Sequence, residues 1–219
     1  MIRLHHVPMA RSFRTLWLLE ELGLDCDVVT YSIRDGSLRA PQFLERAPVG
    51  RVPALDIDGL TVFESAAITQ YLCERHPEAG LAPAPGEPER TRFLEMLSFA
   101  ETMAALVEQL NLNHLFLRDP AQASPVVIKL NTRRLEACVA AFEQMLQDQD
   151  FVLPSGFSAA ETMLGFNMVA VPFYVHLDPY PSVAAYRDRI MARPAFARAQ
   201  SRDGEQDFYK KSFYPIPEG

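Results

Sequence analysis

A cluster of prolines divides this chain of 219 residues into two parts with different patterns. The segment from 77 to 88 holds four prolines and two glycines. Proline removes a backbone donor and fixes its own φ, so such a segment forms neither a continuous helix nor a central strand. We expect a linker here, and the chain is long enough for a domain on each side of it.

Before the proline cluster, short strand-like runs alternate with helical periodicity. The expected elements are a strand at 2–6, a helix at 11–22, a strand at 26–31, a short helix at 41–46, strands at 54–57 and 60–63, and a helix at 65–75. Asp58-Gly59 between the last two strands is a strong signal for a tight hairpin turn. A crossover unit followed by a hairpin predicts an α/β domain with a mixed four-stranded sheet covered by helices.

After the proline cluster, the apolar residues follow a helical period throughout. The expected helices span 89–117, 125–149, 158–174, 181–192 and 194–200, and several of them begin at proline, which suits the first helical turn. The predicted organisation is therefore an α/β domain at 1–78, a linker at 79–87 and an all-helical domain at 88–219. The last stretch, from 202 to 219, is rich in aromatic residues, and we expect it to dock on the body of the protein.

The net charge and the cysteine content indicate which classes of ligand and which cellular compartment are expected. There are 21 basic and 28 acidic residues, a net charge of −7, which disfavours binding to nucleic acid or to an anionic membrane surface. We expect neither a secretory leader nor a membrane span, because no sufficiently long apolar run is present. Cys26, Cys73 and Cys138 are odd in number and widely spaced, which favours a reducing, cytoplasmic setting and no structural metal.

Two neighbouring histidines do not change the expectation about metals. His5 and His6 are consecutive on the first expected strand. Successive side chains on a strand point to opposite faces of the sheet, so these two imidazoles cannot share one metal ion.

Val52-Pro53 stands at the entrance to the third expected strand. Proline at the start of an edge strand is one explanation. The alternative is a cis peptide bond that turns the backbone of Val52 outward, so that its N–H and C=O can pair with an extended, peptide-like ligand.

Glu64-Ser65 stands at the expected start of the helix at 65–75. Ser65 suits a helix N-cap, and an acidic residue is favourable near a helix N-terminus. The same groups also suit a ligand: the helix N-terminus and the Ser65 hydroxyl would bind a carboxylate, while Glu64 would accept an ammonium group. Together they would hold the two charged groups of an α-amino acid.

These motifs, taken as a set, resemble the cytosolic glutathione transferase family, and in particular its bacterial type. The matching segments cover both parts of the chain: 4–6, 11–12, 16–23, the Ala-Pro-Val-Gly-Arg-Val-Pro run at 47–53, the Glu-Ser-Ala-Ala-Ile run at 64–68, 99–101 and the helix-capping segment at 157–166. Each match is weak alone, but the set in this order is specific.

The resemblance implies a thioredoxin-like first domain that binds glutathione, and a helical second domain that lines a pocket for an electrophile. By the resemblance, Val52, followed by Pro53, would pair its backbone with the cysteinyl part of glutathione, and Glu64 and Ser65 would hold its γ-glutamyl end. Arg51 would reach the glycine carboxylate, although it also suits an ordinary surface arginine. The resemblance further implies a cytoplasmic homodimer whose co-substrate is glutathione and whose second substrate is a small apolar electrophile.

The turn after the first strand departs from the family pattern. The family places a serine, cysteine or tyrosine beside the glutathione sulfur, whereas this chain has Met9 and Ala10, whose side chains donate no hydrogen bond. Ser12 is the remaining hydroxyl, and it also suits a helix N-cap. The backbone amides of 10–12 and the charge of Arg11 are further candidates for stabilising a thiolate.

The energy required explains why this departure matters. Lowering a thiol pKa from about 8.5 to about 6.5 takes roughly 2.7 kcal/mol of preferential thiolate stabilisation. A hydrogen bond to a charged group supplies about 1.5–3 kcal/mol. Without a side-chain donor at Met9 or Ala10, we expect a glutathione transferase with weak conjugating activity.

Two alternative functions fit the same residues. One is glutathione-dependent reduction of disulfides or peroxides, in which glutathione itself carries the sulfur chemistry. The other is a non-catalytic interaction module of the same fold. A module that had lost the ligand would not need to keep Arg51, Glu64 and Ser65.

Overall fold

The computed structural model describes residues 1–147, 149–206 and 208–217, and these form two compact units. The first unit contains residues 1–90 together with 191–206, and the second contains residues 91–190 together with the chain from 207 onward. Among the described residues, no helix combines the length and apolar character needed to cross a bilayer.

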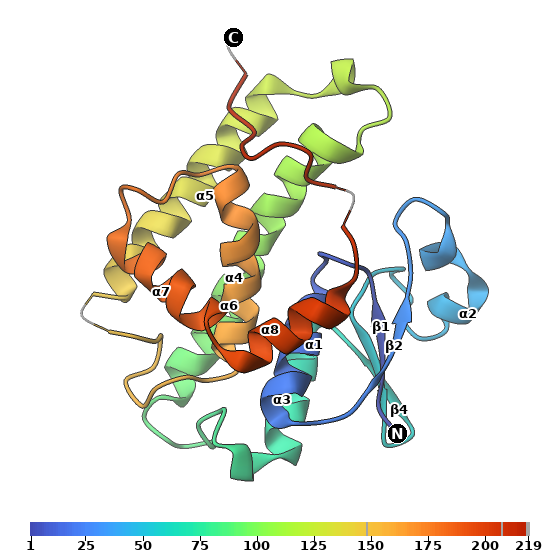
Figure 1. The fold of residues 1–219 in the computed structure, drawn as a ribbon, viewed down its shortest axis with the longest axis vertical. Coiled ribbons are helices and arrows are strands. Elements are labelled where there is room, and N and C mark those ends of the chain that lie inside the picture. The colour runs from blue at the N-terminus through green and yellow to red at the C-terminus, as the bar shows by residue number, and fades with distance from the viewer. Residues whose placement is uncertain (148, 207, 218–219) are drawn as a thin grey trace. The chain divides into compact units, whose positions relative to one another are not determined.

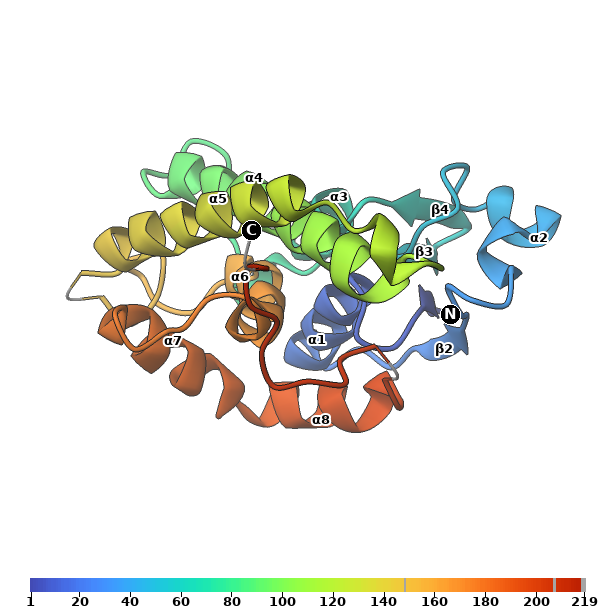
Figure 2. The same ribbon diagram turned by 90° about the horizontal axis from the view of Figure 1, so that it is seen from above.

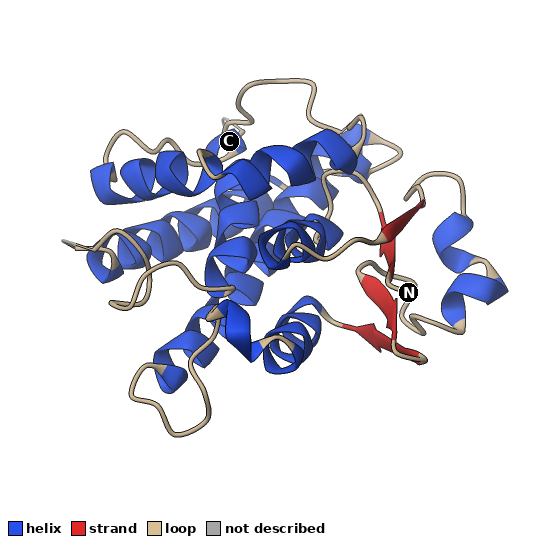
Figure 3. Cartoon of the chain, turned by 60° about the horizontal axis from the view of Figure 1, so that its bottom comes forward, coloured by secondary structure: helices blue, strands red, loops and turns tan. Residues whose placement is uncertain are grey.

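The first unit is built on a four-stranded sheet with the order β2-β1-β3-β4 (Figure 1). The strands are β1 (Arg3–His6), β2 (Asp27–Thr30), β3 (Ala54–Ile57) and β4 (Leu60–Phe63). β1 pairs with β2 in parallel, and β3 is antiparallel to both β1 and β4. The mixed sheet predicted from the sequence is therefore confirmed, and Figure 3 shows the strands in red.

Helices pack against both faces of this sheet. α1 (Ser12–Leu22) and α3 (Ser65–Arg75) contact each other on one face, and the short α2 (Pro41–Leu44) lies on the other (Figure 1). Every residue of α1 from Ser12 to Leu19 is buried. Such a helix is covered on more than one side, which matches its contacts with β1, α3 and α8.

α8 (Pro194–Asp203) comes from the far end of the sequence but packs along α1 in the first unit (Figures 1 and 2). The Phe196 ring stands edge-on to Trp17 with 4.9 Å between centroids. Aromatic pairs of this geometry add about 0.5–1.5 kcal/mol beyond the burial of their surface. The helix was expected to end at 200, but it continues to Asp203, just before Gly204. A glycine after the last turn is a common stop signal, and it marks the observed end better than the shorter prediction did.

The second unit is helical. Its main helices are α4 (Arg90–Asn111, entering from the first unit), α5 (Pro125–Met145), α6 (Ala160–Ala170) and α7 (Pro181–Met191, ending at the unit boundary). α4 is followed by a π-helical turn, Leu112–Phe116, so the long helix expected to reach 117 changes its winding before that residue. α5 ends at Met145, short of the expected 149, and residue 148 lies outside the described part of the chain.

The capping segment before α6 forms in part as the sequence predicts. The Glu161 carboxylate accepts hydrogen bonds from the Ser158 amide at 2.7 Å and the Ser158 hydroxyl at 2.6 Å. The Ala160 amide donates to the Ser158 hydroxyl at 3.3 Å. Only the Glu161 half of the predicted capping box forms, because the Glu161 amide donates to the Ser158 carbonyl and the N-cap is Ala159. The bonds still satisfy buried donors at the start of an apolar helix.

The aromatic tail docks on the second unit, as expected for its described part. The Phe173 and Tyr209 rings are stacked with centroids 3.8 Å apart, and the Tyr209 hydroxyl donates to the Asn111 side chain at 2.9 Å. Residues 207 and 218–219 of that tail lie outside the described residues. The boundaries proposed from the sequence, 1–78, 79–87 and 88–219, remain a prediction about independent domains.

Candidate functional site

The register of the sheet brings three predicted motifs to one end of it. His5 of β1 pairs with Ala54 of β3, and Ala54 in turn pairs with Phe63 of β4. The turn after β1, the Val52-Pro53 segment before β3 and the Glu64-Ser65 segment after β4 therefore leave the sheet at the same end. The turn after β1, which is 40 and more residues away in sequence, thus joins the other two segments in one candidate site.

The segment before β3 contains the predicted cis bond. The Val52–Pro53 peptide is cis, which confirms the bond geometry of the second interpretation of this motif, while the pairing of Val52 with a ligand stays a prediction. The Val52 side chain packs against a buried cluster that includes Phe43, Ala47 and Ala54. Within the described part of the chain, no hydrogen bond engages the Val52 amide or carbonyl. Its peptide groups are therefore available to a ligand.

The loop leading into this segment requires glycine at position 50. Gly50 has φ +64°, and a β-carbon there would lie 2.6 Å from Nη1 of Arg39 and 2.8 Å from the Leu38 carbonyl oxygen. The same Arg39 nitrogen donates to the Val49 carbonyl at 3.2 Å. Arg51 on this loop and Arg39, which contacts it from the 3-10 helix Ser37–Arg39, are both exposed, so positive charge lies near Val52.

The segment after β4 supplies an uncapped helix start. Glu64 is the N-cap of α3, with φ 76° and no side-chain cap hydrogen bond, and Ser65 is the first helical residue. The alternative in which Ser65 caps its own helix is therefore wrong. Ser65 is 3% exposed, and no partner for its hydroxyl is found among the described residues. A positive φ is rare and unfavourable for a residue with a β-carbon, and such strain is concentrated at functional sites.

The turn after β1 uses most of its own donors internally. The Ala10 amide donates to the Val7 carbonyl at 3.2 Å, and the Met9 amide donates to the Asp203 carboxylate at 3.0 and 3.3 Å. Arg11 is the N-cap of α1 and makes no side-chain cap bond. The Ser12 amide has no partner within the described residues, and Ser12 as a whole is 0% exposed, so this amide lies beneath the surface at the helix N-terminus.

The Ser12 hydroxyl lies in the interior. It accepts a hydrogen bond from the Val7 amide at 3.1 Å and lies 2.8 Å from Nδ1 of His6, with the Val7 carbonyl at 3.3 Å as a second acceptor. Both Ser12 and His6 are fully buried. The other nitrogen of His6, Nε2, lies 2.9 Å from the Asp203 carbonyl oxygen and 3.2 Å from Oδ1 of the same residue. With the ring proton on Nε2, every group in this chain of contacts is satisfied.

His5 makes a similar chain on the opposite face of β1. Its Nδ1 lies 2.9 Å from the Tyr31 hydroxyl and its Nε2 lies 3.1 Å from Oδ2 of Asp56. Asp56 also accepts from Thr61 at 2.7 Å and from Arg46 at 3.2 Å. The two neighbouring histidines thus have separate partners on separate faces, as the strand geometry predicts.

The pKa shifts on the His5 face follow from these contacts. Burial works to raise the pKa of Asp56, but the hydrogen bonds from Thr61, His5 and Arg46 lower it overall. Burial, together with the nearby Asp56 charge, raises the pKa of Tyr31 against the opposing effect of Arg46. Asp56 is therefore an ionised hub, and Tyr31 stays protonated at neutral pH.

None of the cysteines belongs to the candidate site. Cys26, Cys73 and Cys138 are unpaired thiols. Burial raises the pKa of the Cys73 thiol to about 12, and burial likewise raises those of Cys26 and Cys138. Thiolate chemistry by this protein therefore requires a thiol from a ligand.

Comparison with known proteins shows which proteins the chain resembles. Residues 1–74 match the family model described as glutathione S-transferase, N-terminal domain. Glutathione S-transferase 4 of Zea mays is 28% identical over 191 residues, which cover 83% of each chain. A glutathione transferase structure from Methylococcus capsulatus is 26% identical, with a TM-score of 0.81, over 93% of this chain and 98% of that one.

The chain is thus similar to glutathione transferases along most of its length, and its first 74 residues match the model of their N-terminal domain. A sphingomonad glutathione S-transferase solved in complex with glutathione is 28% identical, with a TM-score of 0.79, over 92% of this chain and 98% of that one. The thioredoxin-like fold of the first domain and the helical fold that follows it are those expected from the resemblance.

Two residues near the site were not predicted from the sequence. Arg39 left no local signal, because only the close approach to Gly50 places it at the loop. Asp203 is separated from Met9 by 194 positions, and no periodicity indicates that they meet. The Asp-Gly pair at the end of α8 marks a helix end but says nothing of what lies beside it.

Proposed function

We propose that this chain binds glutathione at the end of the sheet where the three motifs meet, and promotes attack of the glutathione thiolate on a small apolar electrophile. The observation that carries the proposal is the convergence of open backbone groups at Val52, the Ser65 hydroxyl and the uncapped start of α3. Glutathione offers a peptide backbone, an α-amino acid end and a carboxylate, and each has a counterpart here.

Each proposed contact uses a different type of group. Val52, held beside Pro53, pairs its peptide N–H and C=O with the cysteinyl residue. Ser65 and the α3 amides bind the γ-glutamyl carboxylate, and Glu64 accepts the ammonium group. Arg51 provides charge for the glycine carboxylate. No metal takes part in this proposal.

Activation of the thiol depends on the turn after β1. The field of the α1 N-terminus, at Ser12, stabilises the thiolate, and the nearby charge of Arg11 adds to that field. Ser12 stays the proposed catalytic residue, with its hydroxyl supporting the turn through His6 and Val7. Met9 and Ala10 contribute no side-chain donor, so conjugation is slow for a member of this family.

The remaining parts of the proposal come from the family resemblance. The protein works as a homodimer, and the second substrate is a small apolar electrophile held with the help of the helical domain. A reducing, cytoplasmic setting suits the three unpaired thiols.

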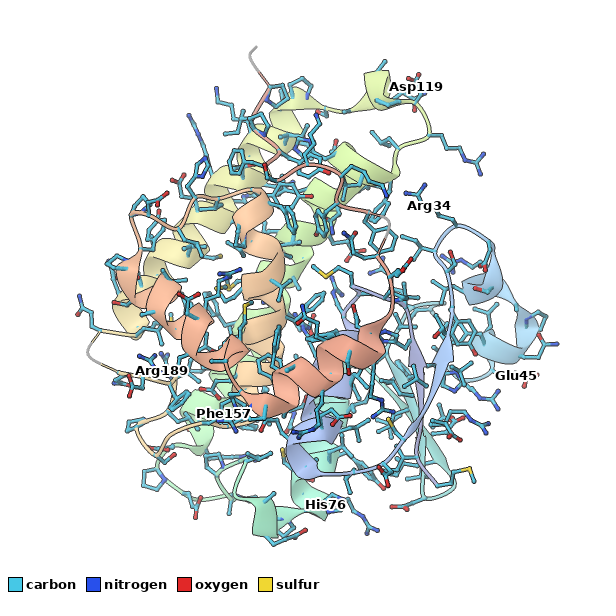
Figure 4. All side chains as sticks on the ribbon, in the orientation of Figure 1. Arg34, Glu45, His76, Asp119, Phe157 and Arg189 are labelled. Atoms are coloured by element: carbon cyan, nitrogen blue, oxygen red, sulfur yellow. The ribbon has the colours of Figure 1, made fainter. Side chains whose placement is uncertain are left out.

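Retention on immobilised glutathione tests the binding proposal. Wild type should bind, Glu64→Ala should flow through, and Glu45→Ala should bind as wild type does. Glu45 is the matched control, because it is an exposed carboxylate at the C-terminal end of α2 and is none of the proposed glutathione-binding residues (Figure 4). If wild type and Glu64→Ala both flow through, the interaction module explains the chain better.

Conjugation and disulfide-reduction assays separate the two enzymatic functions. Conjugation should be detected above the uncatalysed rate in wild type and should be lower in Ser12→Ala. Glutathione-dependent reduction without conjugation would instead favour the reductase.

A further inference from the structure

The end of α8 reaches the turn on which thiol activation depends. Asp203, the last residue of the helix, accepts the Met9 amide with both carboxylate oxygens, at 3.0 and 3.3 Å. Its backbone carbonyl and Oδ1 also face Nε2 of the fully buried His6. The Asp203 side chain is 11% exposed. One residue therefore contacts the turn and the histidine beneath it.

The helix that carries Asp203 is firmly attached to α1. Arg193 makes two hydrogen bonds of 2.7 Å to the Glu21 carboxylate, and Arg202 donates to Glu20 at 2.6 Å. Arg198 donates to the same Glu20 carboxylate at 2.9 Å. Bidentate and networked arginine–carboxylate pairs hold their geometry better than single surface pairs.

The pKa values of Glu20 and Arg202 agree with an ion-pair network between α1 and α8 that stays charged. Burial works to raise the pKa of Glu20, but the hydrogen bonds from Arg202 and Arg198 lower it overall. The hydrogen bond to Glu20 raises the pKa of Arg202. The network is thus charged across the neutral range, and α8 is held on α1 there.

Gly204 brings this end of α8 into contact with the turn. It has φ +92°, and a β-carbon there would lie 3.2 Å from Cγ of Pro8. Pro8 directly precedes Met9, so the Asp203-Gly204 pair covers the turn from one side. A larger residue at 204 would displace either the helix end or the turn.

Met9 has a conformation that needs such support. Its φ is 55°, in the left-handed region that residues with a β-carbon rarely adopt. A hydrogen bond from its own amide to a fixed carboxylate favours this conformation over the relaxed one. The direction of the following amides, including that of Ser12, depends on it.

We propose that Asp203 is a positioning residue for the thiol-binding turn. By accepting the Met9 amide and facing His6, it fixes the left-handed Met9 and so the path of the chain into the N-terminus of α1. This inference rests on the proposed function for its catalytic consequence. The role in ordering the turn is a property of the protein without ligand.

The test uses two pairs of variants in the full-length protein. Asp203→Ala removes the acceptor, whereas Asp203→Asn keeps a side-chain oxygen for the Met9 amide and removes the charge. Asp56→Ala and Asp56→Asn are the matched controls, because Asp56 contacts the neighbouring histidine on the opposite face of β1. Hydrogen exchange of a peptide covering 7–13, the dissociation constant for glutathione and kcat at saturating glutathione are measured for each.

We expect Asp203→Ala to exchange about tenfold faster over 7–13 and to lose about tenfold in kcat, because small displacements of catalytic donors are costly. Its glutathione dissociation constant should stay within about threefold of wild type, since the binding contacts lie elsewhere. In Asp203→Asn, both the hydrogen exchange over 7–13 and kcat should be close to those of wild type. Asp56→Ala should lower the thermal midpoint of unfolding yet leave kcat within about twofold.

Several results would overturn the inference. These are unchanged exchange and kcat in Asp203→Ala, an equal loss of kcat in Asp56→Ala, or an Asp203→Asn variant as impaired as Asp203→Ala, which would indicate a role for the charge. If Asp203→Ala does not fold, Gly204→Ala replaces it and should speed exchange over the same peptide. A wild type that shows no glutathione turnover would defeat the proposed function, while the exchange data would still decide whether Asp203 orders the turn.

Discussion

The two histidines of β1 have the same kind of neighbours but different surroundings. His5 lies between the Tyr31 hydroxyl and Asp56, and His6 lies between the Ser12 hydroxyl and Asp203. On the His5 face, Asp56 is 25% exposed and also pairs with Arg46. On the His6 face, the hydroxyl and the ring are buried and the aspartate also holds the Met9 amide.

This difference means that the two faces of β1 respond differently when a hydrogen-bond partner is lost. The His5 chain links β1, β3 and the α2 side, where water can replace a lost partner. The His6 chain links β1, α1 and the end of α8, where a lost partner leaves a polar group buried without a replacement. Loss of a buried partner costs more than loss of an exposed one, so equivalent substitutions should differ in effect.

Removing each imidazole is the largest perturbation. His6→Ala should lower the free energy of unfolding by about 3 kcal/mol, because the Ser12 hydroxyl and the Asp203 carboxylate both lose a buried partner. His5→Ala should cost about 1–2 kcal/mol, since Asp56 keeps Arg46 and Thr61. Urea denaturation measures both, and equal losses would contradict the distinction between the faces.

Removing the hydroxyl at the end of each chain gives a smaller contrast. Ser12→Ala should cost about 1–2 kcal/mol, because the buried Val7 amide and Nδ1 of His6 lose their partner. Tyr31→Phe should cost about 0.5–1 kcal/mol, since its hydroxyl lies nearer to solvent. Thermal unfolding of the two variants, each compared with wild type, gives the two stability losses. A larger loss in Tyr31→Phe than in Ser12→Ala would contradict the distinction between the two faces.

The dependence of stability on acid pH should show the contribution of Asp56 on the His5 face. The hydrogen bonds from Thr61, His5 and Arg46 outweigh burial and lower the pKa of Asp56, so the folded protein binds this proton less readily than the unfolded chain. The contribution is present above the unfolded pKa and is lost as the pH falls through the folded one. The free energy of unfolding of Asp56→Asn should therefore fall less between pH 6 and pH 3 than that of wild type. We expect the difference between the two proteins to be smaller than the stability loss caused by Ser12→Ala. Parallel pH profiles of stability for wild type and Asp56→Asn would exclude Asp56 as a source of the stability that is lost in acid.

The smallest effect is expected at the outer end of the His5 chain. Thr61 is exposed and donates to Oδ1 of Asp56 at 2.7 Å. Thr61→Val keeps the shape and the strand preference but removes that bond, so we expect a loss of about 0.5 kcal/mol. A loss above about 1.5 kcal/mol would mean that Asp56 is less accessible to water than its exposure indicates.

Much of the first unit could be predicted because its signals are local. The hairpin at Asp58-Gly59 fixes the bounds of β3 and β4, which match the prediction residue for residue. The start of α3 at Ser65 also follows from a short motif. In the helical unit the long periods predicted the helices, but the change to π-helical winding after Asn111 has no sequence signal of its own.

The candidate site was predictable only in part, for a physical reason. Val52 and Ser65 belong to motifs within a few residues of strand ends, and the sheet register brings those ends together. Asp203 enters through the packing of a helix from the other end of the chain. Such long-range contacts depend on tertiary packing, which local periodicity does not encode.

The thiolate absorbance of bound glutathione, followed against pH, measures directly whether this protein stabilises the thiolate. A free thiol of this kind ionises near about 8.5, and the field of the helix N-terminus at the start of α1 should lower the bound value to about 7.5, equivalent to about 1.4 kcal/mol. The titration is made with the site saturated, as verified by calorimetry. A bound thiol pKa about one unit below the free value would support thiolate stabilisation at the turn from Val7 to Ser12. A value equal to that of free glutathione in the saturated protein would contradict it.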